Sequence, residues 1–280
     1  MLRSRCPLIW TKMTKMTSRT NPGTRTMRRI AFFVEGRTEV HFVERFLRDL
    51  ANRDEITIDK REILGGGKSG AALTITSIDA THRASDEKFY VLIHDCVGEN
   101  NVKPRLAEQH QALTAAGYEV IVGIRDVRPQ YSATTLSTLR KSMKSAIDKN
   151  LAPVVFILPL EEVEAWFLAE HTHFERIAPQ ITVPAIVANL GFDPANDDMT
   201  QRPTPADDLA ACYRLGGRSY TKRKTKRTVN ALDMQLVRTT VADKMSELKK
   251  LVRIVDKFLT PIASAEVQAA PGASAAAPVE

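Results

Sequence analysis

The chain has 280 residues, 43% of them hydrophobic, which is enough for one substantial α/β core with an appendage. Residues 1–29 hold eight of the 40 basic side chains and no acid, so the net charge of +7 is concentrated there. The other residues therefore hold 32 basic and 33 acidic side chains, and the charge is weak support for nucleic-acid binding by the folded part. Three widely separated cysteines (Cys6, Cys96 and Cys212) argue against a disulfide framework or a structural zinc site. They favour a reducing, cytoplasmic compartment, and no apolar run is long enough to span a membrane.

Composition divides the chain into four parts. Residues 1–27 are interpreted as a disordered basic arm, or as the result of a start codon set too far upstream, because Met27 directly precedes the first apolar run. Residues 28–168 alternate apolar runs with helical patterns, which is typical of an α/β domain. Residues 169–260 have a less regular helical pattern broken by prolines, and 261–280 are rich in Ala, Pro and Ser and are expected to be disordered.

The first strong element is the apolar run from Ile30 to Val34, which predicts a strand buried on both faces. Glu35 follows the strand, and Gly36 permits a tight turn. Apolar residues then recur at helical spacing as far as Leu50, with Thr38 as the expected cap. Glu39 is interpreted as a first-turn residue that the helix dipole favours.

A weaker second strand is predicted between Ile56 and Leu64, near an edge of the sheet. The glycine-rich run from Gly65 to Gly70 does not have P-loop spacing, because Glu62 stands where the earlier glycine would have to be. We interpret it as an ordinary turn into a helix from about Ala71 to Ala84.

Three more buried strands are predicted at residues 89–93, 120–124 and 154–158, with helices at 102–116 and 132–149 between them. Strands separated by helices imply a parallel sheet whose strands end at one edge, where α/β proteins bind ligands. The acidic residues at or just after the predicted strand ends are Glu35, Asp95, Asp126 and the pair Glu161 and Glu162.

These carboxylates are the ligand type that Mg²⁺ prefers, with Mn²⁺ as the alternative metal. We expect Glu35 and Asp95 to be catalytic, and Glu35, Asp95, Glu162 and Glu164 to be the metal ligands. Asp126 is interpreted instead as a helix cap or an ion-pair partner.

Three motifs resemble signatures of Toprim domains, the fold of topoisomerases, primases and nucleases of the overcoming-lysogenization-defect type. The first is Val34-Glu35-Gly36-Arg37-Thr38-Glu39. The second is Asp95, which matches the first residue of the family's D-x-D, although Val97 stands at the position of the second Asp. The third, Glu162-Val163-Glu164-Ala165-Trp166, is similar to the E-x-E-A-W motif of a small uncharacterised bacterial Toprim-like family.

The resemblance implies a Toprim-like parallel sheet flanked by helices, with a helical C-terminal extension. It also implies a Mg²⁺-dependent nuclease acting on DNA or RNA, with a role in defence against mobile elements and a separate ATPase partner protein. Val97 favours the alternative of a non-catalytic Toprim-like module that binds nucleic acid or a protein partner. Nucleotidyl transfer, as in primases, is a second alternative, for which the sequence has no nucleotide-binding motif.

Beyond Phe167, residues 218–227 form a basic stretch in which Lys222, Lys224 and Lys226 are the expected contacts to a phosphate backbone. Trp166 is expected in the core, and His171 and His173 on the surface. A last helix, with an interruption allowed, is predicted from about Ala231 to Phe258.

Overall fold

The computed structural model describes residues 27–260, except 66–70, 129–130, 132 and 146. The basic arm before residue 27, the glycine-rich residues 66–70 and the tail after residue 260 lie outside the described residues. The two terminal interpretations therefore stay predictions.

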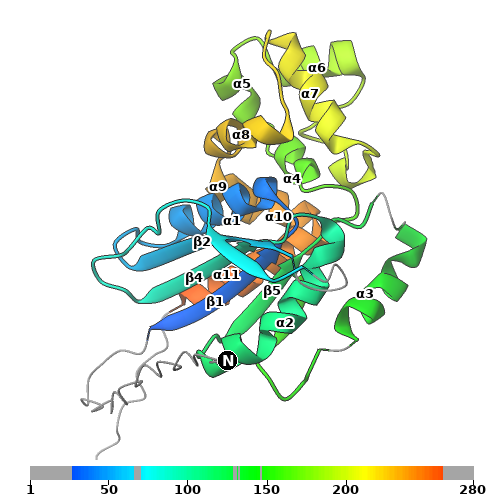
Figure 1. The fold of residues 1–280 in the computed structure, drawn as a ribbon. Helices are drawn as coiled ribbons and strands as arrows, with labels where there is room; N and C mark the ends of the chain where they lie inside the picture. Colours follow the sequence, from blue (N-terminus) through cyan, green and yellow to red (C-terminus); the bar gives the residue numbers. More distant parts are fainter. Residues whose placement is uncertain (1–26, 66–70, 129–130, 132, 146, 261–280) are drawn as a thin grey trace, which may run out of the picture.

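A six-stranded, mostly parallel sheet forms the centre of the molecule (Figure 1). Its strand order is β3-β2-β4-β1-β5-β6, and only β3 runs antiparallel to its neighbour. The strands are β1 (Arg28–Val34), β2 (Ile56–Leu64), β3 (Thr74–Ser77), β4 (Phe89–Asp95), β5 (Val120–Ile124) and β6 (Val154–Ile157). The expected fold class, an α/β parallel sheet flanked by helices with a helical C-terminal extension, is confirmed, with β3 as the one antiparallel strand of the described sheet.

Strand β1 occupies the position where the chain changes direction across the sheet. The chain places β2 and β4 on one side of β1, and then β5 and β6 on the other. Val34, the last residue of β1, lies level with Asp95 of β4 and with Ile124 of β5. The ends of these three strands therefore meet at the switch point, where open α/β sheets bind their ligands.

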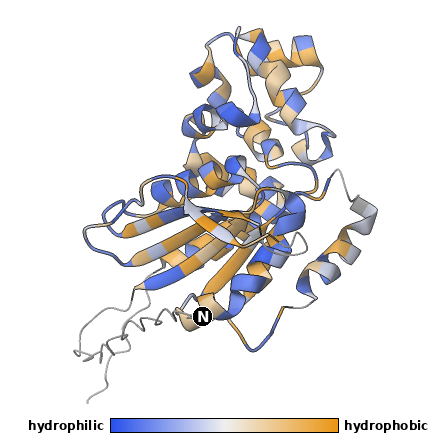
Figure 2. Ribbon diagram, in the orientation of Figure 1, coloured by the Kyte–Doolittle hydropathy of each residue, from blue (hydrophilic) through white to orange (hydrophobic). Residues whose placement is uncertain are grey.

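Both faces of the sheet are covered. Successive residues of β1 point to opposite faces, and the residues on each face are apolar and buried. Ile30 and Phe32 contribute to a large core shared with helix α1, and Ala31 and Phe33 contribute to a second core on the opposite face. Figure 2 shows the central strands coloured mainly as hydrophobic, as expected for a sheet covered on both sides. The α-helices are α1 (Arg37–Leu50), α2 (Val102–Ala115), α3 (Leu136–Lys144), α4 (Glu164–Ala169), α5 (His173–Ile177), α6 (Val183–Leu190), α7 (Pro205–Leu215), α8 (Thr225–Ala231), α9 (Met234–Leu236), α10 (Ala242–Lys244) and α11 (Ser246–Leu259).

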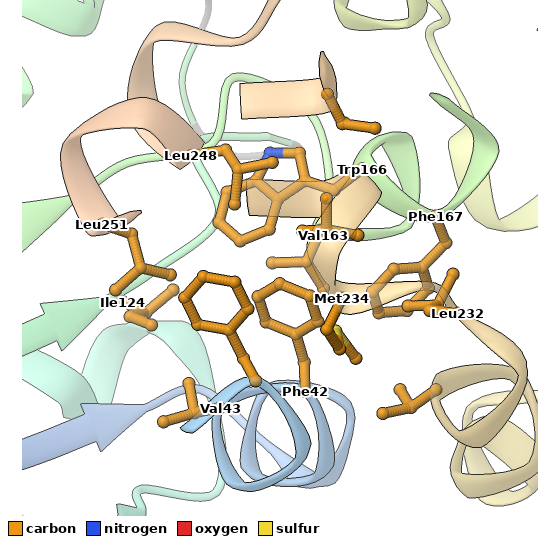
Figure 3. Packing of buried hydrophobic residues seen from close by; sticks show 14 of the residues in the cluster. Phe42, Val43, Ile124, Val163, Trp166, Phe167, Leu232, Met234, Leu248 and Leu251 are labelled. Carbon is orange, nitrogen blue, oxygen red and sulfur yellow. The ribbon is translucent and has the colours of Figure 1, made fainter. Parts of the chain in front are cut away.

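The C-terminal helices share the larger core with the sheet. Helices α5–α8 lie beyond α1 in the view of Figure 1, and α11 returns to the strands. Trp166 of α4 packs against Phe42 of α1, with ring centroids 5.4 Å apart, and Leu248 and Leu251 of α11 line the same cluster (Figure 3). Trp166 is 3% exposed, so its predicted place in the core is confirmed.

Several predicted elements differ from the structure. The helix expected at 71–84 is wrong: this segment contains β3, which pairs with β2, so β2 is second from the edge. Helix α3 is confined to Leu136–Lys144 and is shorter than the predicted 132–149; residue 132 itself is not described. The last predicted helix is divided into α9, a π-helical turn (Val237–Val241), α10 and α11, with a break at the extended residue Met245.

Candidate functional site at the carboxyl edge of the sheet

The loop after β1 is fixed by hydrogen bonds to the loops after its two neighbours. The carbonyl oxygen of Glu35 accepts a hydrogen bond from the Gly98 N–H at 2.7 Å. Oε2 of its side chain accepts one from the Asp126 N–H at 3.2 Å. Glu35 is thereby held, half-buried, between the ends of β4 and β5.

Glu39 is in the first turn of α1, as predicted. Its Oε2 accepts a hydrogen bond from the backbone N–H of Gly36, the N-cap residue, at 3.0 Å. Thr38, the expected cap, lies inside the helix instead. Glu39 is only 5% exposed, so it faces inward, beside Glu35, rather than toward solvent.

An open cavity of about 600 Å³ lies at these strand ends, and its size is within the usual range for ligand sites. Four carboxylates line it, those of Glu35, Glu39, Glu62 and Asp95, and three cations line it too. The cations are Arg37 of α1 and the neighbouring pair Lys222 and Arg223. We call this space the acidic cavity.

Asp126 and Glu164 are buried close to this cavity, although they do not line it. Asp126 follows β5 and is 3% exposed, and Glu164 begins α4 and is fully buried. Asp126 Oδ1 and Glu164 Oε2 are buried oxygens without a hydrogen-bond partner among the described residues. Such oxygens are rare in folded proteins and carry a large desolvation cost unless a proton or a cation is close.

Burial and the charges of neighbouring acids raise the pKa values of two of these acids, Glu39 and Asp126. Burial raises the pKa of Glu39 well above its usual value, and the negative charges of Glu35 and Glu164 raise it further. Burial likewise raises the pKa of Asp126 well above its usual value, with further contributions from Glu39, Glu35 and Glu164. We refer to Glu35, Glu39, Asp126 and Glu164 as the acidic cluster.

Glu164 is held by two groups from the C-terminal helical part. Burial raises its pKa, while the charge of Lys222 and a hydrogen bond from Tyr220 lower it. The Tyr220 hydroxyl donates that bond to Glu164 Oε1 at 2.7 Å. Lys222 itself forms an ion pair with Glu162 at 3.1 Å, and the charges of Glu164 and Glu162 outweigh its burial and raise its pKa. The segment from Tyr220 to Lys222 therefore brings one hydroxyl and one cation to the acids of the sheet edge.

Asp95 ends β4, which lies on the other side of β1 from β5 and Asp126, and it is paired differently. Its Oδ2 lies 3.0 Å from Arg37 Nε, and its Oδ1 accepts a hydrogen bond from the Val97 N–H at 2.9 Å. Burial raises its pKa, and the bond from Val97 and the charge of Arg37 oppose that effect. Val97 has a positive φ of 52° and is exposed, so the side chain at the second D-x-D position lies on the cavity wall.

The expected site residues therefore divide into groups. Glu35 and Asp95 line the same cavity, and Glu164 belongs to the acidic cluster. Glu162 is engaged by Lys222 and by the Ala206 N–H, which donates to its Oε2 at 3.1 Å. Among the lysines of the basic stretch, Lys222 lines the acidic cavity, Lys226 lines a neighbouring one, and the Lys224 ammonium donates to Ser219 Oγ.

Two interpretations from the sequence are wrong. Asp126 neither caps a helix nor forms an ion pair with a described residue, and it lies buried beside the other acids. His173, expected on the surface, is fully buried between the rings of Phe174 and Tyr213. The sequence signal that could have placed Asp126 in the site is its position just after a buried strand, which is also the position of Glu35.

Within the described residues, no group of three or more His, Cys, Asp or Glu side chains is already arranged to hold a metal ion. Mg²⁺ commonly takes only one or two carboxylates and keeps several waters. The two partnerless oxygens of Asp126 and Glu164, and the raised pKa values around them, therefore fit a nearby divalent cation. No helix in the described part of the chain is both long enough and apolar enough to cross a membrane.

Comparison with known proteins identifies a family. No curated protein and no solved structure matches the sequence significantly. Residues 34–253, which include every member of the acidic cluster and the segment from Tyr220 to Lys222, match one family model. The chain belongs to this family, which is described as Domain of unknown function (DUF4276).

Proposed function

We propose that the protein is a Mg²⁺-dependent phosphodiesterase that cleaves DNA or RNA in the cytoplasm, with a Toprim-like arrangement of its site. One observation carries the proposal: four acids, two that follow strands β1 and β5 and two in the first turns of helices α1 and α4, lie together at or beside a cavity that cations also line. Burying like charges together is costly, and a bound cation removes the cost.

The residues proposed to hold the metal differ in part from those expected from the sequence. Glu35 and Glu164 remain, and Asp126 and Glu39 join them because their charges act on one another. Glu162 is assigned to positioning Lys222, with which it is paired. Mn²⁺, which also takes oxygen ligands, is the alternative metal. When bound, the metal would polarise the scissile phosphate and lower the pKa of a bound water.

The cations of the cavity are suited to the phosphate groups of the substrate. Lys222 and Arg223 line it from one side, and Arg37 from α1. Arg37 is fixed by two carboxylates, Asp95 at 3.0 Å and Glu62 at 2.9 Å, so Asp95 acts here by orienting an arginine. A guanidinium has five N–H donors in one plane, so Arg37 keeps donors for a phosphate while the two carboxylates fix its orientation. A role in defence against mobile elements and a separate ATPase partner, both implied by the Toprim resemblance, belong to the same proposal.

A second candidate is a non-catalytic module that binds nucleic acid through the same cavity. Val97 at the second D-x-D position favours it, as does the pairing of Asp95 with Arg37. On this alternative, the acidic cluster would be protonated rather than metal-bound.

The test is incubation of the purified protein with plasmid, single-stranded DNA and tRNA, each with Mg²⁺, with Mn²⁺ and with a chelator. The proposal expects cleavage of at least one of these substrates with metal and none with chelator. Binding without cleavage under every condition, including in the presence of an ATPase encoded beside the protein, would support the second candidate and contradict the first.

A further inference from the structure

A second cavity, of about 320 Å³, adjoins the acidic cavity. Its walls come from α1, the turn that follows it and α8, and His41 of α1 lines both cavities. The two spaces therefore meet at His41. The second cavity differs in charge, because four cations and only two acids line it.

The lining residues of α1 lie on one side of the helix. They recur at intervals of three and four residues from His41 to Asp49, which places them on a single face. This face is about 12 Å long at 1.5 Å per residue. That length spans about three of the axial steps of about 3.4 Å by which one strand of a duplex rises per nucleotide, so the surface can contact only a few nucleotides.

The cations on this surface have two different roles. Arg45 and Arg48 are paired along the helix with Asp49 and Glu44, respectively, at 2.9 and 2.8 Å. Lys226 of α8 and Arg53, in the turn after α1, form no ion pair with any residue that the structure describes, and both are exposed. Their charges are thus available to a ligand from solvent.

We infer that this surface holds the phosphate backbone of a single nucleic-acid strand and leads it into the acidic cavity. The inference rests on the proposed function, to which it adds the path of the substrate. The surface contacts phosphates and not base edges, because cations outnumber acids by four to two among its lining residues, so binding is independent of sequence. The chemistry that it recognises, a phosphodiester chain, is common to DNA and RNA.

The experiment measures binding of labelled single strands of DNA and of RNA by fluorescence anisotropy, with a chelator present so that cleavage does not occur. The variant of this surface, which we call the groove variant, is Arg53→Gln with Lys226→Gln. The matched control is Arg253→Gln with Lys257→Gln, which removes the same charge from two exposed residues of α11 that line neither cavity. Thermal unfolding of both variants verifies that they remain folded.

For strands longer than about four nucleotides, we expect the negative slope of log K against log salt to become less steep by about 1.4 in the groove variant. The variant loses two phosphate contacts, and each single-strand contact contributes about 0.7 to the slope. The control should keep the wild-type slope, and strands too short to reach past His41 should bind both variants equally. Equal slopes for groove variant and control, or no binding of either strand by wild type, would overturn the inference. Cleavage with Mg²⁺ is measured separately. Absence of cleavage alone contradicts the proposed function. Cleavage together with equal slopes contradicts only the inference that this surface binds the strand.

Discussion

The backbone N–H of Asp126 donates a hydrogen bond to Glu35 Oε2 at 3.2 Å, joining the residue after β1 to the loop after β5. Through this contact, two acids that are 91 positions apart in sequence become neighbours at the switch point of the sheet. The bond lowers the pKa of Glu35, but burial, the larger effect, raises it. Without a cation, Glu35 and its neighbours are therefore poised to take up protons.

The first prediction concerns pH and stability. The pKa values of Glu39 and Asp126 are raised above their ordinary values of 4.5 and 3.8. Between the ordinary and the raised pKa values, the folded protein therefore keeps protons that the unfolded chain loses. Their contribution to the free energy of unfolding is full below these ordinary values and is lost as pH rises through the raised ones. Without metal, Asp126→Asn should therefore become more stable relative to wild type as pH rises.

Urea unfolding at a series of pH values in chelator measures this difference. Asp54→Asn, which makes the same change at an exposed aspartate outside the acidic cluster, is the control. Excess Mg²⁺ should reduce the advantage of Asp126→Asn, because only wild type gains stability from the ion. A difference between Asp126→Asn and wild type that is constant across pH would show that Asp126 is not titrating as we infer.

The second prediction concerns Tyr220, which positions Glu164. Tyr220→Phe removes the hydroxyl that donates to Glu164 Oε1 at 2.7 Å, a bond to a charged group worth about 1.5–3 kcal/mol. The pKa of Glu164 should then rise, and the acidic limb of the pH–activity profile should move to higher pH. Tyr213→Phe is the matched control, because that buried hydroxyl donates to Thr228 and not to a carboxylate. If both variants keep the wild-type profile, Tyr220 has only a structural role.

The third prediction concerns the approach of β5 to β6. A Cβ atom added at Gly123 would lie 2.6 Å from the ring of Phe156, too close for any real contact. Gly123→Ala should therefore lower the free energy of unfolding by about 1–3 kcal/mol, the usual cost of overpacking. In the double variant with Phe156→Leu, the ring is absent, so the two costs should not add. Strict additivity in urea unfolding would contradict this account of the contact.

The strands that bring the site together could be predicted from sequence because each is a short apolar run followed by an acid. This signal identified β1, β4, β5 and β6, and it placed Glu35 and Asp95 at one edge. Strand β3 has no such signal: it is four residues long, Ile75 is its one apolar residue, and all four residues are exposed. It forms by pairing with β2.

The acidic cluster was less accessible to sequence reasoning because it depends on tertiary contacts. Glu39 has the ordinary position of a first-turn acid, and only the packing of α1 buries it beside Glu35. Tyr220 is 56 residues from Glu164 in sequence, and no spacing rule relates the two. His173 was misassigned for the same reason, because α5 packs against α7 and α8 and buries a residue with a polar side chain.

The central claim, that the acidic cluster holds a divalent cation, is tested most directly by titration calorimetry with Mn²⁺. Glu35→Gln and Asp126→Asn retain side-chain volume and remove one charge each, and Glu175→Gln, an exposed residue of α5, is the control. We predict that wild type and the control bind Mn²⁺ with equal affinity, and that each cluster variant binds at least about tenfold more weakly, a difference of about 1.4 kcal/mol. Binding of Mn²⁺ by Glu35→Gln and Asp126→Asn with wild-type affinity, or no binding by wild type, would contradict the claim.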